Sequence, residues 1–133
     1  MIILPSLLNA NTYNIKEQLQ ILKDKEIDHL HVDVMDGQFV PSQAFGPNTV
    51  NDLKKMTDFK LDVHLMIENP EKHIPLYQNA DIITVHYEST RHLYRAIQLI
   101  KNMGLKANGI KLSEQMPKTS LISKSERSFY FFY

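Results

Sequence analysis

Hydrophobic and polar positions along the chain follow two alternating periods. Apolar runs or a period of two, typical of buried strands, occupy 2–4, 30–35, 61–66, 81–86 and 105–112. Between these segments, apolar residues recur every three to four positions beside charged ones, which predicts helices over 15–23, 50–56 and 90–103. Pro70 suits the first turn of a further short helix. Strand alternating with helix in this way indicates a parallel α/β sheet, wound open or as part of a barrel.

Three residues have the chemistry expected at helix ends. Asn14 precedes the first helical segment and Thr90 stands at the start of the last, and their side-chain oxygens can accept hydrogen bonds from free backbone N–H groups. Gly104 follows the last helical segment and is a natural C-terminal stop. We therefore expect Asn14 and Thr90 to act as N-caps.

Three of the expected strands carry polar side chains on one face only. Alternation places the following residues on these faces: His31, Asp33 and Met35; Asp62, His64 and Met66; Thr84 and His86. Helices cover the outside of such a sheet, so these side chains should converge on the inner face. We expect them at the carboxyl ends of the strands, where α/β active sites form.

A divalent metal ion is one explanation of this polar face. His31, Asp33 and His64 offer imidazole and carboxylate ligands, which suit ions such as Zn²⁺, Mn²⁺ or Fe²⁺. Alternatively, the histidines are buried core residues with satisfied hydrogen bonds, and Asp33 caps a turn. Asp62 and His86 are expected to be structural or to support the ligands.

Composition narrows the range of partners. The 133 residues are 43% hydrophobic and 23% charged, with 15 Lys and Arg against 15 Asp and Glu, as in an ordinary soluble globular chain. No basic field attracts nucleic acid or an anionic membrane, which favours a small or neutral partner. The chain has no cysteine, so a metal would be held by histidine and carboxylate. Pro5 interrupts the apolar start, which argues against a signal peptide or membrane span and makes a cytoplasmic location the expectation.

Several motifs, in this order, closely resemble the ribulose-phosphate 3-epimerase family. They are LPSLL at 4–8, HVDVMDG at 31–37 with FVP at 39–41, FGP at 45–47, LDVHLM at 61–66 with NP at 69–70, and VHYE at 85–88. The resemblance implies a (β/α)8 TIM barrel, of which this chain would hold about the first five β/α units. It also implies an isomerase of the pentose phosphate pathway that interconverts D-ribulose 5-phosphate and D-xylulose 5-phosphate through an enediolate.

The same resemblance implies residue roles. His31, Asp33 and His64 match the ligands of a divalent metal ion, which would be Zn, Fe, Mn or Co, and Asp33 also matches one catalytic acid or base. The positions that match contacts to the sugar phosphate are Ser6, His64, Met35 and Met66.

The resemblance runs from residue 2 to about 109, and the chain then departs from the family. A complete barrel takes ~250 residues, and the family's second catalytic aspartate and Gly-rich phosphate loops have no counterpart in this sequence. We therefore expect a partial ribulose-phosphate-binding TIM barrel over 1–112 and a divergent tail over 113–133, as a truncated or frameshifted gene would produce. Turnover by the isolated chain should be poor, and the exposed edges of a half-barrel favour a homo-oligomer or other self-association.

Two other functions stay open. One is a D-allulose-6-phosphate 3-epimerase-like enzyme, which would use the same metal and first acid. The other is a non-catalytic half-barrel fragment that binds metal or pairs with a partner. Activity toward hexulose over pentulose phosphate would favour the first alternative, and metal retention without epimerisation would favour the second.

Overall fold

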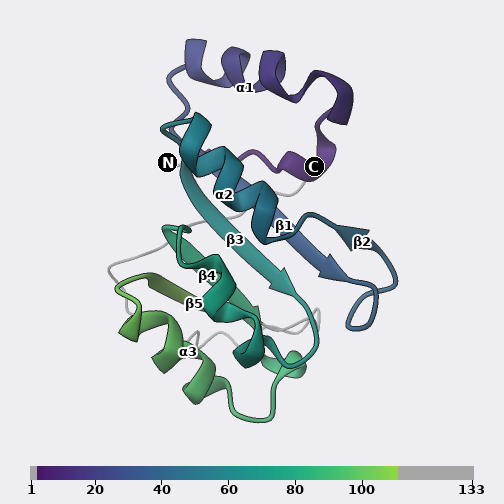
Figure 1. Ribbon diagram of the computed structural model, residues 1–133, viewed down its shortest axis with the longest axis vertical. Helices are drawn as coiled ribbons and strands as arrows, with labels where there is room; N and C mark the ends of the chain where they lie inside the picture. The colour runs from purple at the N-terminus through teal and green to yellow at the C-terminus, as the bar shows by residue number, and fades with distance from the viewer. Residues whose placement is uncertain (1–2, 111–133) are drawn as a thin grey trace.

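The computed structural model describes residues 3–110 of the chain (Figure 1). The tail expected over 113–133 lies outside the described residues, as do the ends of the first and fifth expected strands. The boundary near residue 112 therefore stays a prediction.

A single sheet forms the centre of the described structure. Its strands are β1 (His29–Asp36), β2 (Gln43–Ala44), β3 (Lys60–Met66), β4 (Ile82–His86) and β5 (Lys106–Ile110). They lie in the order β2-β1-β3-β4-β5. The pairs β1–β3, β3–β4 and β4–β5 are parallel, and β2 pairs antiparallel with the end of β1. The parallel strands follow chain order from one neighbour to the next, as consecutive β/α units of a barrel do.

The expected strands at 30–35, 61–66, 81–86 and 105–112 are confirmed as β1, β3, β4 and β5, the last described as far as Ile110. The strand expected at 2–4 is not confirmed. From residue 3 to Pro5 the chain is in no strand, and it meets the sheet through one parallel bridge between Ser6 and His31. The His31 N–H donates to the Pro5 carbonyl at 2.9 Å. Pro5 has no N–H to return, which limits a longer ladder here.

The described residues form three α-helices: α1 (Ile15–Asp24) before β1, α2 (Pro47–Met56) between β2 and β3, and α3 (Leu93–Asn102) between β4 and β5. Five 3₁₀ turns complete the described elements: η1 (Leu7–Asn9), η2 (Thr12–Asn14), η3 (Pro70–Lys72), η4 (Ile74–Tyr77) and η5 (Tyr87–Ser89). The three expected helices are thus confirmed, and the short helix expected at Pro70 is η3. None of the helices within 3–110 has the length and apolar character needed to cross a membrane.

The expected helix ends are confirmed only in part. Asn14 occupies the N-cap position of α1 but makes no side-chain cap hydrogen bond. The last helix begins at Leu93, and its N-cap is His92 in place of Thr90. Thr90 Oγ1 instead accepts the N–H of His92 at 3.0 Å, which closes the turn before the helix. Gly104 follows α3 with φ of 78°, a conformation that favours glycine.

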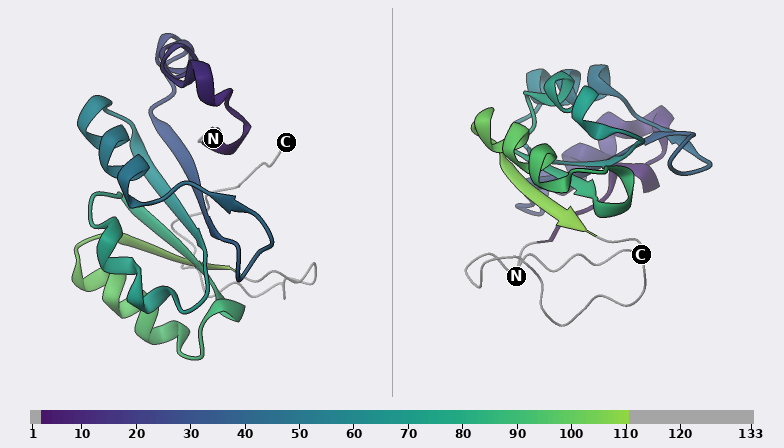
Figure 2. Two further views of the ribbon diagram at one scale, coloured as in Figure 1. Left: turned by 45° about the vertical axis from the view of Figure 1, so that its right-hand side comes forward. Right: turned by 90° about the horizontal axis from the view of Figure 1, so that it is seen from below.

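The apolar core lies between the sheet and its helices. Figures 1 and 2 show α2 and α3 on the same face of the sheet. The apolar strand positions on this side are buried with the inward residues of the helices: Leu30, Val32, Val34, Leu61, Val63, Leu65, Ile83 and Val85 with Val50, Leu53, Ala96 and Ile100. Period-two alternation therefore leaves the polar side chains of the strands on the opposite face.

The core predicts a large cost for shortening a strand residue. Leu61 is fully buried, so Leu61→Ala should lower the free energy of unfolding by about 2–5 kcal/mol through lost apolar burial and the cavity left behind. The control is Leu76→Ala, at a position 52% exposed, which should change it by less than about 0.5 kcal/mol. Urea titration followed by circular dichroism measures both, and equal effects would contradict this packing.

Candidate metal and active site

Strand register brings the predicted site residues together. In the parallel pairing of β1 with β3, His31 lies opposite Asp62 and Asp33 opposite His64, and His64 in turn lies opposite Thr84 of β4. Residues opposite each other in register share a face of the sheet. The group lies in the middle of β1 and β3, however, and not at their carboxyl ends as the sequence suggested.

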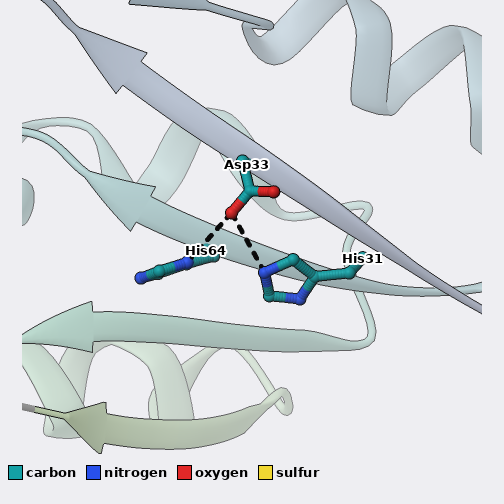
Figure 3. Close-up of side chains that lie close together, drawn as sticks. All are labelled: His31, Asp33 and His64. Carbon is teal, nitrogen blue, oxygen red and sulfur yellow. Dashed lines mark hydrogen bonds and ion pairs between the residues drawn. The ribbon is translucent and has the colours of Figure 1, made fainter. Parts of the chain in front are cut away.

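His31, Asp33 and His64 converge on a single carboxylate oxygen (Figure 3). His31 Nε2 and His64 Nδ1 each lie 3.1 Å from Asp33 Oδ1. One ligand atom from each residue lies within 4.8 Å of the others, and all three side chains are buried. Two imidazole nitrogens and a carboxylate oxygen are ligands that borderline divalent ions prefer, so this donor set fits such an ion.

Asp33 is held as an anion by its neighbours. Its second oxygen, Oδ2, accepts the hydroxyl of Ser6 at 2.6 Å. Burial acts to raise the pKa of Asp33, but hydrogen bonds from His31, His64 and Ser6 outweigh burial and hold this pKa well below its usual range. The centre of the group is therefore a buried negative charge.

His31 lies between two carboxylates. Its Nδ1 is 3.0 Å from Asp62 Oδ2, and its Nε2 faces Asp33. Burial acts to lower the pKa of His31, but the hydrogen bonds to Asp33 and Asp62 raise it to about 9. Asp62 also accepts the hydroxyl of Thr84 at 3.2 Å. Asp62 thus fixes the ring of His31 from the side opposite Asp33.

His64 contacts another histidine, His86, through the ring nitrogen that faces away from Asp33. Its Nε2 is 2.7 Å from Nε2 of His86, and the two rings stack with centroids 4.8 Å apart. Burial, and then the charge of His64, lower the pKa of His86 to about 4 against an opposing effect of Glu88. Within residues 3–110 the Nδ1 of His86 has no hydrogen-bond partner. The alternation placed His86 on the polar face, but it gave no sign of this contact.

Met35 and Met66 lie beside the candidate metal group of His31, Asp33 and His64. They pair with each other in register, on the same face as Asp33 and His64, and both are partly exposed. The structure thus brings together all the residues to which the sequence assigned metal or substrate contacts. Their roles in binding stay predictions.

A pocket of about 370 Å³ opens beyond the carboxyl ends of the strands. The loops after β1, β3 and β4 line it with Gln38, Phe39, Glu68, Asn69, Glu88, Ser89, Thr90 and Arg91. The Phe39 ring also packs on His86, with centroids 5.2 Å apart, so the pocket adjoins the polar face. This lining could not be predicted from periodicity because loop residues carry no period; the motifs FVP at 39–41, NP at 69–70 and VHYE at 85–88 each contribute one of its residues.

The fold and the buried group together define a partial (β/α)8 barrel with a candidate metal centre. Comparison with known proteins gives the family. The model of the ribulose-phosphate 3 epimerase family matches residues 2–125. The chain therefore belongs to this family, whose fold is the TIM barrel. The matched range includes 113–125, part of the segment 113–133 that is expected to be a divergent tail, and that expectation stays a prediction.

Individual relatives agree with the family match. The chain is 44% identical to ribulose-phosphate 3-epimerase of Bacillus subtilis over 85% of its length and 52% of that protein. It is 43% identical to the chloroplastic ribulose-5-phosphate-3-epimerase of Arabidopsis thaliana, over 91% of its length and 44% of that protein. It is 41% identical to ribulose-phosphate 3-epimerase of Aquifex aeolicus, over 95% of its length and 56% of that protein. The chain thus spans about half the length of the curated relatives it matches.

The hydrogen bond from Thr84 to Asp62 predicts a measurable cost when it is lost. Thr84→Val keeps nearly the same volume but leaves a buried carboxylate oxygen without its donor, so the free energy of unfolding should fall by about 1–3 kcal/mol. Thr12→Val, at an exposed position, is the control and should have little effect. Chemical denaturation of both variants tests this, and a stable Thr84→Val protein would count against the network.

Proposed function

We propose that this chain carries the metal-binding part of an epimerase that interconverts D-ribulose 5-phosphate and D-xylulose 5-phosphate in the pentose phosphate pathway. The observation that carries the proposal is the buried group in which His31 and His64 share one oxygen of Asp33, in a chain of this family. The names of its relatives support the same reaction.

A divalent ion, Zn, Fe, Mn or Co, would be held by His31, Asp33 and His64. The fit rests on the donor set: two imidazole nitrogens face the same carboxylate oxygen, and Asp62 and His86 support the rings from behind. When bound, the ion supplies positive charge for the oxygens of the enediolate.

Asp33 is the base in this proposal. Inverting the carbon beside a ketone requires removal of its proton to give an enediolate, and a carboxylate kept ionised at neutral pH can take that proton. The Ser6 hydroxyl holds the carboxylate in place through Oδ2. Ser6, His64, Met35 and Met66 contact the sugar phosphate in this proposal, the two thioethers lying over the enediolate.

Inversion also needs an acid on the opposite face of the enediolate. Within residues 3–110, Asp33 is the carboxylate of the candidate metal group, and Asp62 is engaged with His31 and Thr84. We therefore propose that the described half of the site suffices for proton removal and for return of a proton on the same face. Self-association and a cytoplasmic location stay predictions.

The metal site predicts a loss of affinity when its carboxylate is removed. In calorimetric titration with Zn²⁺, Asp33→Ala should raise the dissociation constant, because both a ligand and a charge disappear. The increase should exceed the roughly 10–100-fold that is typical when a residue supporting a ligand is lost. Asp58→Ala removes a carboxylate that is 98% exposed and should bind as the unchanged chain does. Equal affinities of the two variants would argue against the site.

The proposed role of Asp33 predicts isotope exchange in heavy water. With Zn²⁺ and D-ribulose 5-phosphate, deuterium should enter carbon 3 faster than D-xylulose 5-phosphate forms, because one acid serves one face. Asp33→Asn should slow this exchange by roughly 10²–10⁴-fold, and Asp58→Asn should not. Proton NMR follows both processes. Exchange unaffected by Asp33→Asn would refute the role, and faster exchange on D-allulose 6-phosphate would favour a hexulose substrate.

A further inference from the structure

We propose that His86 is a positioning residue of the metal site: its Nε2 accepts the Nε2–H of His64, so that His64 presents Nδ1 to the ion. This inference rests on the proposed metal site and goes beyond it, because His86 is not one of the three ligands. It assigns a task to the residue of the polar face whose second nitrogen has no partner within 3–110.

The geometry of the two rings carries the argument. Their Nε2 atoms are 2.7 Å apart, which leaves room for one proton between them. His64 Nδ1 points to Asp33, on the side where the three donor atoms converge. If Nδ1 binds an ion, the neutral ring carries its proton on Nε2, and that N–H points directly at His86. His86 must then be the acceptor.

The same arrangement occurs at His31 with another partner. Asp62 of β3 lies behind His31 of β1, and His86 of β4 lies behind His64 of β3. Ligating histidines commonly donate their second N–H to a carboxylate, a carbonyl or water, which fixes the tautomer and the ring. Because the two supporting residues hold different nitrogens, His31 offers Nε2 and His64 offers Nδ1.

Packing alone does not account for a histidine at position 86. The residue is 3% exposed, and burying a ring nitrogen without a partner costs stability. An aliphatic residue would fill this space beside Phe39 without that cost. The hydrogen bond to His64 is what a histidine adds here.

Two variants separate positioning from packing. His86→Leu keeps an apolar side chain but removes the acceptor, whereas His86→Gln offers an amide oxygen to the His64 N–H. In titration with Zn²⁺, the dissociation constant should rise roughly 10–100-fold in His86→Leu and return most of the way to the unchanged value in His86→Gln. The control is His73→Leu at an exposed histidine, which should bind normally. Circular dichroism verifies that each variant is folded.

Nitrogen-15 NMR of the Zn²⁺-loaded chain gives a readout that a merely structural role would not produce. His64 should be protonated on Nε2 and ligated through Nδ1, and His86 should be protonated on Nδ1. Ligation of His64 through Nε2, or equal affinity of His86→Leu and the unchanged chain, would overturn the inference while leaving the metal site intact. Failure of the unchanged chain to bind Zn²⁺ would overturn both. If His86→Leu does not fold, the tautomers in the unchanged chain decide.

Discussion

The buried carboxylate of Asp33 is the group on which the rest of the site depends. The Asp33 side chain is 6% exposed, and its carboxylate accepts hydrogen bonds from Ser6, His31 and His64. A buried charge without partners would lower the stability of the fold by several kcal/mol. These donors are therefore needed for folding as well as for the proposed metal binding. They come from three parts of the chain, and the pairing of β1 with β3 must be in register for His64 to reach Asp33.

The two faces of the sheet therefore have different tasks. On the helix side, apolar residues of the strands pack against α2 and α3 and supply the hydrophobic part of the stability. On the other side, two sets of hydrogen bonds cross the strands. In one set Asp62 contacts both His31 and Thr84, and in the other His64 contacts both Asp33 and His86. A parallel sheet covered on both faces is normally apolar throughout. The polar face therefore indicates a binding or reactive site on that side of the sheet, where a purely structural sheet would have apolar side chains.

Local patterns predicted most of the fold and the members of the site. Period-two alternation is a property of a few neighbouring residues, so β1, β3 and β4 and the face shared by His31, Asp33 and His64 could be predicted from the sequence. The polar face left a divalent metal ion as one of two explanations, and the barrel and the substrate class came from the family motifs. β2 could not be predicted because two residues carry no period, and its pairing follows the loop that leaves β1 through Gly37 with φ of 73°.

Contacts between elements account for most of what the sequence could not predict. His64 lies opposite Thr84 in register, so its contact with His86, two positions further along β4, is diagonal and depends on the reach of two imidazole side chains. The position of the group within the strands depends on where β1 and β3 end, at Asp36 and Met66, and element ends are not set by the period of the strand residues.

The arrangement of donors would let the same residues form the hydrogen-bonded group described here or hold the proposed ion. Two ring nitrogens face Asp33 Oδ1, and both supporting contacts lie on the far side of their rings. An ion among the three inner atoms would take the place of the protons that point at Oδ1. The outer contacts need not change partners, because Asp62 accepts from Nδ1 of His31 in either case and the proton between His64 and His86 can belong to either ring. The rings are thus held on their outer side, and their inner nitrogens stay available for exchange of these protons for a cation.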